Sequence, residues 1–240
     1  MPKKARKNPN SKRFAEIAAK VDQNKEYDVE EAIKLVKEIA STKFDESIDL
    51  AIRLGVDPRK SDQNVRGITN LPHGTGKTVK VAVLAKGELA KEAEDAGADR
   101  VGDEDLIKAI QEGWKDFDIM LATNDMAPQI GKVGRFLGTK TPNKRNGTVT
   151  DSVASTVKDL KNATRVEYRI DKAGIVHMPM GRCSFDEAKL MENFNKALDA
   201  VIRAKPSSSK GKYLKSISMS STMGPSLNIE ANAASKGAGH

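Results

Sequence analysis

Residues 79–84 read Val-Lys-Val-Ala-Val-Leu, a nearly continuous apolar run of the length typical of a strand covered on both faces. A helical stretch follows at 87–96, and short strands continue to alternate with helices up to residue 137. The further elements predicted there are a strand at 100–101, a helix at 103–113, a strand at 117–122 and a helix at 126–137. This alternation predicts a parallel, helix-covered sheet of Rossmann-like type.

The two ends of the chain follow a different pattern, with a period of two. Residues 48–54 and 166–170 alternate apolar with polar side chains, which indicates strands with one buried face. The turn at 171–174 predicts that 175–178 returns as the hairpin partner of 166–170. The other elements predicted are helices near 11–21, 28–41, 152–160 and 184–204, an extended piece at 65–68, and strands at 213–219 and 227–229. Capping boxes are expected at Asp28 with Glu31 and at Ser184 with Glu187.

The antiparallel pattern at both ends, with the parallel pattern only between them, predicts the domain organisation. We expect an α+β split domain, an antiparallel sheet with helices, built from residues 1–67 and 159–240. An α/β Rossmann-like domain, residues 68–158, is inserted into it. The two connections are expected to act as a hinge, at Gly67 and Lys158. Three consecutive small domains are the alternative, but they leave the N-terminal segment with one strand and little sheet to join.

The positive charge of the chain is concentrated at its two ends. The net charge is +8 and the sequence pI is about 9.4, which suggests a polyanionic partner. Residues 1–67 carry a net +3 and residues 159–240 a net +5, whereas residues 68–158 are neutral. Residues 1–13 hold six basic and no acidic side chains, which predicts a mobile basic arm or, alternatively, a solubilising tail. The small residues of 231–240 predict a disordered tail.

Several classes of function lack the residues that they need. Cys183 is the single cysteine, so no intrachain disulfide is expected. We expect Cys183 to be a small buried thiol in a protein of a reducing compartment. No apolar run reaches the roughly 18 residues that span a bilayer, so we expect a cytosolic protein without a membrane partner. His73, His177 and His240 have no ligand-spaced partners, and no nucleophile, base and orienting residue stand out. We therefore expect no metal, no cofactor and no enzymatic activity.

The segment Gly74-Thr75-Gly76-Lys77-Thr78 resembles the end of a phosphate-binding loop. Leu71 stands where that motif requires its first glycine, and a strand rather than a helix is predicted to follow. No G-x-G-x-x-G run follows the strand at 79–84 either. A nucleotide-binding α/β enzyme is the alternative function, but this loop does not support it.

The stretch Ser220-Ser221-Thr222-Met223-Gly224-Pro225-Ser226 combines hydroxyls, a flexible thioether and a Gly-Pro turn. Such residues suit contact with a polar, furrowed surface such as folded RNA. Taken alone, the stretch is more typical of an ordinary surface turn between two strands. The choice between the two depends on the rest of the chain.

Five segments together are more specific than any one of them. They are KFDES at 43–47, DPRKSDQNVRG at 57–67, LPHGTGK at 71–77, AEDAGAD at 93–99 and STMGPS at 221–226. In these segments, and over nearly its whole length, the chain resembles the bacterial form of the ribosomal protein L-one family. That resemblance implies that the protein is part of the mobile stalk of the large ribosomal subunit, beside the exit site for deacylated tRNA. It also implies a split domain with a Rossmann-like insertion.

The partners that the resemblance implies are all nucleic acids. They are large-subunit rRNA, exit-site tRNA, whose release the stalk assists, and the protein's own mRNA, whose translation it represses. We expect a cytoplasmic protein of the ribosome that is a monomer when free of it. A general nucleic-acid chaperone held only by charge is a second alternative, because the net charge alone does not require a specific RNA.

The resemblance also assigns an rRNA grip to the split domain. The positions that it assigns are Lys43, Phe44, Ser221, Thr222, Met223 and Gly224. Lys43 is expected to neutralise phosphate, and Phe44 to pack on a sugar or unstacked base, with a core anchor as the alternative for Phe44. Thr222 is expected to bond a 2′-hydroxyl, Met223 to adapt to a shallow groove, and Gly224 to permit close backbone approach.

Residues 139–147 depart from the family pattern. They read Thr-Lys-Thr-Pro-Asn-Lys-Arg-Asn-Gly, which is shorter and more basic than the Gly/Pro-rich run usual in the family. Lys140, Lys144 and Arg145 are therefore expected to touch nucleic acid directly as secondary contacts.

Overall fold

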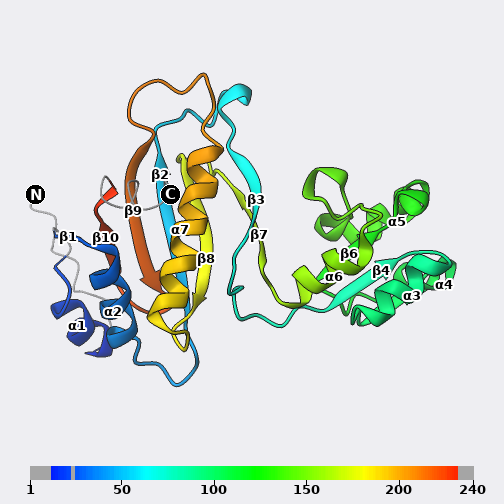
Figure 1. Ribbon diagram of the computed structural model, residues 1–240, viewed down its shortest axis with the longest axis horizontal. Helices are drawn as coiled ribbons and strands as arrows, with labels where there is room; N and C mark the ends of the chain where they lie inside the picture. Colours follow the sequence, from blue (N-terminus) through cyan, green and yellow to red (C-terminus); the bar gives the residue numbers. More distant parts are fainter. Residues whose placement is uncertain (1–11, 23–24, 232–240) are drawn as a thin grey trace, which may run out of the picture. The chain divides into compact units, whose positions relative to one another are not determined.

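The computed structural model describes residues 12–22 and 25–231 (Figure 1). Nearly all of the predicted basic arm 1–13 and of the predicted tail 231–240 lies outside these residues. Lys12 is already the first residue of helix α1 (Lys12–Ala19), so Lys12 and Arg13 belong to a helix rather than to an arm.

The chain divides into two compact units. The first combines Met1–His73 with Tyr168–His240, and the second is Gly74–Glu167. Gly67 lies inside β3 (Arg66–Asn70) and Lys158 inside α6 (Val153–Lys161), where backbone hydrogen bonds fix the chain. Neither residue is at a crossing between the units, and a hinge at either position stays a prediction. The crossings fall after His73 and after Glu167, the latter within β7 (Arg165–Arg169).

A five-stranded sheet forms the centre of the first unit, with the strand order β1-β10-β9-β2-β8. The strands are β1 (Glu26–Tyr27), β2 (Ser47–Leu54), β8 (Ile175–Arg182), β9 (Leu214–Ser221) and β10 (Ser226–Ile229). Neighbouring strands are antiparallel, except that β1 is parallel to β10. In β2 the alternation predicted from the sequence is realised, because Ile48, Leu50, Ile52 and Leu54 are all buried.

Helices cover one face of this sheet (Figure 1). Helix α2 (Val29–Ile39) packs on β9 and β10, and α7 (Glu187–Arg203) packs on β8 and on α2. The stripes that they bury include Ile33 and Val36 of α2 and Leu190 and Phe194 of α7, each at most 1% exposed. Burying one such side chain contributes about 1.5–3 kcal/mol, so this face supplies the core of the unit.

Three local predictions in the first unit are wrong. Strand 166–170 does not form a hairpin with 175–178: β7 pairs with β3 in a separate two-stranded sheet, and only the bridge Ile170↔Val176 joins the expected partners. The two capping boxes do not form either. Asp28 and Asp186 occupy the N-cap positions without side-chain cap bonds. Ser184 Oγ donates instead to Asp45 Oδ2 at 2.8 Å, which ties the start of α7 to the segment before β2.

The second unit contains the parallel sheet predicted around residues 79–84, with the strand order β5-β4-β6. The strands are β4 (Val81–Leu84), β5 (Arg100–Gly102) and β6 (Ile119–Ala122). Helices α4 (Glu104–Gln111) and α5 (Ala127–Leu137) pack on one face, and α3 (Glu88–Asp95) and α6 pack on the other. Val81 and Val83 face one side and Ala82 and Leu84 the other, which explains why this strand is apolar throughout.

Candidate nucleic-acid interface

The positions expected to grip RNA meet at one end of the five-stranded sheet. β2 begins at Ser47, three residues after Phe44 in the sequence, and Ile48 pairs with Ser221 at the end of β9. The turn that joins β9 to β10 therefore lies beside the segment that enters β2. We call residues 42–46 and 221–224 together the sheet-end loops.

Hydrogen bonds between Thr222 and Ser47 join the two sheet-end loops. Thr222 N donates to Ser47 O at 3.0 Å, and Ser47 N donates to Thr222 Oγ1 at 3.1 Å. The Thr222 hydroxyl donates to Ser47 O at 3.2 Å. Its proton is therefore used within the protein, and it retains one lone pair with which to accept a hydrogen bond from a 2′-hydroxyl.

Two large apolar side chains of these loops face solvent. Phe44 is 55% exposed and Met223 49% exposed, and both exceed the other two exposed large apolar residues among those described, Ile68 and Phe136. The alternative interpretation of Phe44 as a core anchor is therefore wrong. Lys43 is also exposed, and its amine forms no ion pair with any residue of 12–22 or 25–231. A cation and two apolar groups are thus available at the same end of the sheet.

Arg13 is a member of this site that sequence analysis missed. Its Nη2 donates to Met223 O at 3.0 Å and its Nη1 to Ser41 Oγ at 3.2 Å. Helix α1 thereby contacts the loop 221–224 at Met223 and, at Ser41, the residue that precedes the loop 42–46. The basic run had suggested only a mobile arm, and nothing in its composition indicated a fixed arginine.

A carboxylate lies beneath the loops. Glu46 is 1% exposed, and its Oε2 accepts a hydrogen bond from Met223 N at 2.9 Å. Burial raises its pKa, but the Met223 N–H and the side chains of Ser221 and Thr42 together hold that pKa below its ordinary value. Glu46 Oε1 and Ser221 Oγ are both buried without a hydrogen bond of regular geometry, although the hydroxyl is near enough to the carboxylate to lower its pKa.

Ser221 differs from the other expected contact residues because it is only 3% exposed. Its side chain supports the turn from below and does not face solvent. Gly224 lies against it: a Cβ at Gly224 would be 2.4 Å from Ser221 Oγ and 3.7 Å from Ile39 Cδ1. The glycine is therefore required by close packing within the protein, in addition to any approach to a partner.

The basic loop 139–147 belongs to the second unit, and part of its charge is already engaged there. Lys140 Nζ donates to Phe117 O and lies 5.0 Å from the centre of the Phe117 ring. Arg165 donates to the carbonyls of Asn146 and Gly147, which fixes the end of the loop. Lys144 is exposed, and the side chain of Arg145 lies outside the described part of the chain.

Gly74 serves packing within the second unit. Gly74 has a φ of +64°, and a Cβ there would be 2.4 Å from Asn162 O. Thr75 N donates to Ala163 O at 3.0 Å, so this amide is directed at protein. A strand, β4, follows this segment, where a phosphate-binding loop would lead into a helix.

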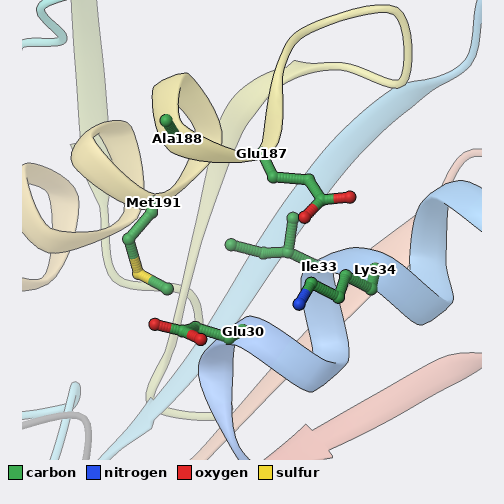
Figure 2. Close-up of a pocket in the computed structure, with 6 residues that line it drawn as sticks. All are labelled: Glu30, Ile33, Lys34, Glu187, Ala188 and Met191. Atoms are coloured by element: carbon green, nitrogen blue, oxygen red, sulfur yellow. The ribbon is translucent and has the colours of Figure 1, made fainter.

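A groove with an apolar floor lies between α2 and α7. Figure 2 shows Ile33 and Lys34 on α2 facing Glu187 and Met191 on α7, with Glu30 at the edge of the groove. The groove has a volume of about 230 Å³. Its two carboxylates and one amine make its rim acidic, which does not suit a polyanion.

Other chemistry is not assembled in the part of the chain that the structure describes. There, no group of three His, Cys, Asp or Glu side chains is arranged to hold a metal ion. Residues 12–22 and 25–231 also include no helix long and apolar enough to cross a membrane. Burial, with the nearby carboxylates of Glu46 and Asp45, raises the pKa of Cys183 to about 11, so it is a thiol rather than a nucleophilic thiolate at neutral pH.

Comparison with known families gives one match. A family model described as the ribosomal protein L1p/L10e family matches residues 36–225. This span covers most of the chain and contains both sheet-end loops. The chain therefore belongs to the ribosomal protein L1p/L10e family, with a structural role in the large ribosomal subunit and rRNA as its ligand.

Proposed function

We propose that this protein is the bacterial form of its family and grips large-subunit rRNA with the sheet-end loops of the first unit, to form the mobile stalk beside the tRNA exit site. The observation that carries this proposal is the exposure of Phe44 and Met223 at one end of the sheet, with the backbone of Met223 held by Glu46 and Arg13. Folded RNA offers sugars and unstacked bases to such side chains, and phosphates to Lys43. In this role the protein is a cytoplasmic component of the ribosome and a monomer when free of it.

The test is binding of the full chain to a stalk rRNA fragment at several salt concentrations. Lys43→Ala is expected to weaken binding about fivefold and to reduce the slope of log affinity against log salt by about 0.9, because one phosphate contact is lost. Lys196→Ala is the matched control, since Lys196 is an exposed lysine of the same unit on α7. Equal affinity for an unrelated duplex at matched salt would contradict specific recognition and favour a chaperone held by charge. Saturable micromolar binding of ATP or NAD would favour the enzyme alternative.

Repression of the protein's own mRNA is the second part of the proposal. The same loops would bind the messenger if it presents a fold similar to the stalk rRNA, so the two RNAs would compete for one site. In a reporter fused to the messenger leader, Met223→Ala is expected to relieve repression in proportion to its loss of rRNA affinity. Undiminished repression by this variant would separate the two activities and contradict a shared site.

A different surface of the first unit suits exit-site tRNA. At the opposite end of the sheet, Arg59, Arg169 and Lys172 line a hollow of about 420 Å³. Lys60, Lys210 and Lys215 line another of about 490 Å³. β2 has eight residues, so its two ends are separated by about 25 Å, which leaves room for two RNAs at once.

Arg59→Ala combined with Arg169→Ala is expected to lower the affinity for deacylated tRNA in a salt-dependent manner while rRNA binding stays within about twofold. The Lys196→Ala variant again serves as the control. A parallel loss of rRNA affinity would show that the two ends of the sheet do not act separately.

A further inference from the structure

The buried carboxylate of Glu46 is unexpected beneath a surface that binds a polyanion. A negative charge within a few ångströms of an RNA phosphate opposes binding, and the opposition is stronger where water is excluded. Glu46 is 1% exposed, so neither water nor RNA reaches it directly. Its role must therefore be exerted through the residues that it touches.

The contact that Glu46 makes is with the backbone of the residue that presents the exposed thioether. Glu46 Oε2 accepts from Met223 N at 2.9 Å, and on the other side of the same residue Arg13 Nη2 donates to Met223 O at 3.0 Å. Gly224 N donates to Ser221 O at 3.2 Å and closes the turn. Met223 is thus held at its amide by an anion and at its carbonyl by a cation, which fixes both peptide planes that orient its side chain.

Fold stability alone does not explain a carboxylate at this position. Glu46 Oε1 is buried without a hydrogen bond of regular geometry, and a buried polar atom in that position opposes folding. The hydrogen bonds from Met223, Ser221 and Thr42 hold the pKa of Glu46 below its ordinary value, so the group is charged at neutral pH. A charged acceptor makes a stronger and more directional bond to the Met223 N–H than a neutral one.

We propose that Glu46 is the positioning residue that sets the specificity of the RNA grip. It fixes the backbone of residues 222–224 for one RNA fold, and its charge lowers the affinity for any RNA that offers phosphates without that fold. The proposal rests on the proposed function of the sheet-end loops. It predicts that removing the charge and removing the hydrogen-bond acceptor have opposite effects, because they act on different RNAs.

Two variants of the full chain separate these effects, measured with the stalk rRNA fragment and with an unrelated RNA duplex at matched salt. Glu46→Ala removes both charge and acceptor: affinity for the stalk fragment is expected to fall at least tenfold and affinity for the duplex to rise about twofold. Glu46→Gln keeps an oxygen that accepts from Met223 N–H, but more weakly than a carboxylate does, so affinity for the stalk fragment is expected to stay unchanged or to fall by up to threefold. Its duplex affinity is expected to rise as in Glu46→Ala.

A charge-matched control is Asp49→Asn. Asp49 is an exposed residue of β2, and its replacement removes one negative charge without touching the turn. It is expected to raise the affinity for both RNAs slightly and equally. If Glu46→Ala behaves like Asp49→Asn, Glu46 acts only through charge and the proposal is overturned.

A direct readout of positioning is the hydrogen exchange rate of the Met223 amide, which is expected to rise in Glu46→Ala and to recover in Glu46→Gln. An unchanged rate in Glu46→Ala would contradict the proposal. If Glu46→Ala does not fold, the affinities of Glu46→Gln for the two RNAs still test the proposal. A higher affinity for the duplex without a gain for the stalk fragment supports it. An equal gain in affinity for both RNAs overturns it. Lys43→Ala measured in parallel identifies which idea fails, because an unaffected Lys43→Ala contradicts the grip itself.

Discussion

The sheet-end loops of the first unit and the basic loop 139–147 of the second unit share a sequence feature, since each combines turn-forming residues with at least one lysine. Their structures differ in what the side chains are free to do. In the sheet-end loops, buried groups such as Glu46 and Ser221 hold the backbone, and Phe44 and Met223 are left exposed. In the basic loop, Lys140 is engaged with a carbonyl and a ring of its own unit.

Under the proposed function, the local count of cations is a poor guide to the RNA site. The second unit, Gly74–Glu167, has no net charge, and the first carries the whole +8. Within the first unit, the feature that distinguishes the sheet-end loops is exposed apolar surface on a constrained backbone. A site of this kind loses little conformational entropy when it binds, which favours specific over purely electrostatic association.

The largest effect is expected for Gly224→Val. Its Cβ would lie 2.4 Å from Ser221 Oγ, so the turn must shift and with it Met223. We expect a loss of rRNA affinity of about 100-fold, roughly 2.7 kcal/mol, in an equilibrium binding assay. Gly131→Val is the control, because no atom lies within 4 Å of a Cβ at that position. If Gly224→Val binds rRNA with near-native affinity, the turn is an ordinary connection between strands and not part of the RNA grip.

A smaller effect is expected for Phe44→Ala and for Met223→Ala. Both side chains are about half exposed, so truncation removes contact area without opening a cavity, and the fold should be preserved. We expect each to weaken rRNA binding about tenfold, roughly 1.4 kcal/mol. Phe136→Ala, which removes a phenylalanine that is 44% exposed in the second unit, should bind as the wild type does. If all three variants bind equally well, exposed apolar groups are not what distinguishes the two regions.

The sequence predicted the five-stranded and the three-stranded sheets, but it did not indicate the role of Glu46. Alternation from Ile48 to Leu54 and the apolar run at 79–84 have unambiguous periods, so both sheets were predicted. The pairing of β7 with β3 was not, because the turn at 171–174 favoured a local hairpin and no sequence signal outweighs such a turn.

Glu46 was overlooked because it sits among charged residues in Lys-Phe-Asp-Glu-Ser. It is, however, in phase with Ile48, Leu50, Ile52 and Leu54, and that alternation placed it on the buried face. Arg13 carried no comparable signal, since its partner Met223 is 210 residues away.

The pH dependence of stability gives a third test. The pKa of Glu46 is lowered from an ordinary value of 4.5, so its contribution to folding is present above that value and is lost as the pH falls through the lowered pKa. Gln at this position does not titrate. In urea titrations we compare the free energy of unfolding of the wild type minus that of Glu46→Gln. We expect this difference to be constant from pH 7 to about pH 5 and to become less positive below pH 4.5, because the wild type alone loses stability as Glu46 is protonated. A difference that grows on acidification would contradict a depressed pKa.

The smallest effect is expected in the basic loop of the second unit. Lys140→Ala and Lys144→Ala should each change rRNA affinity by less than about threefold, roughly 0.6 kcal/mol, because Lys140 is already bonded to Phe117 and Lys144 is an exposed cation in a unit without net charge. Lys140→Ala is also expected to lower thermal stability slightly through loss of its bond and ring contact. A tenfold loss of affinity in either variant would make this loop a principal contact.

The most direct test of the account removes the second unit. A shortened chain that joins Met1–His73 to Tyr168–His240 through a Gly/Ser linker keeps both sheet-end loops and the whole net charge of +8. Circular dichroism and a cooperative unfolding transition establish whether it folds, and its affinity for the stalk rRNA fragment is then measured at the same salt as that of the full chain. The account predicts an affinity within tenfold of the full chain. A folded shortened chain that loses more than tenfold, about 1.4 kcal/mol, would contradict the assignment of the RNA grip to the first unit.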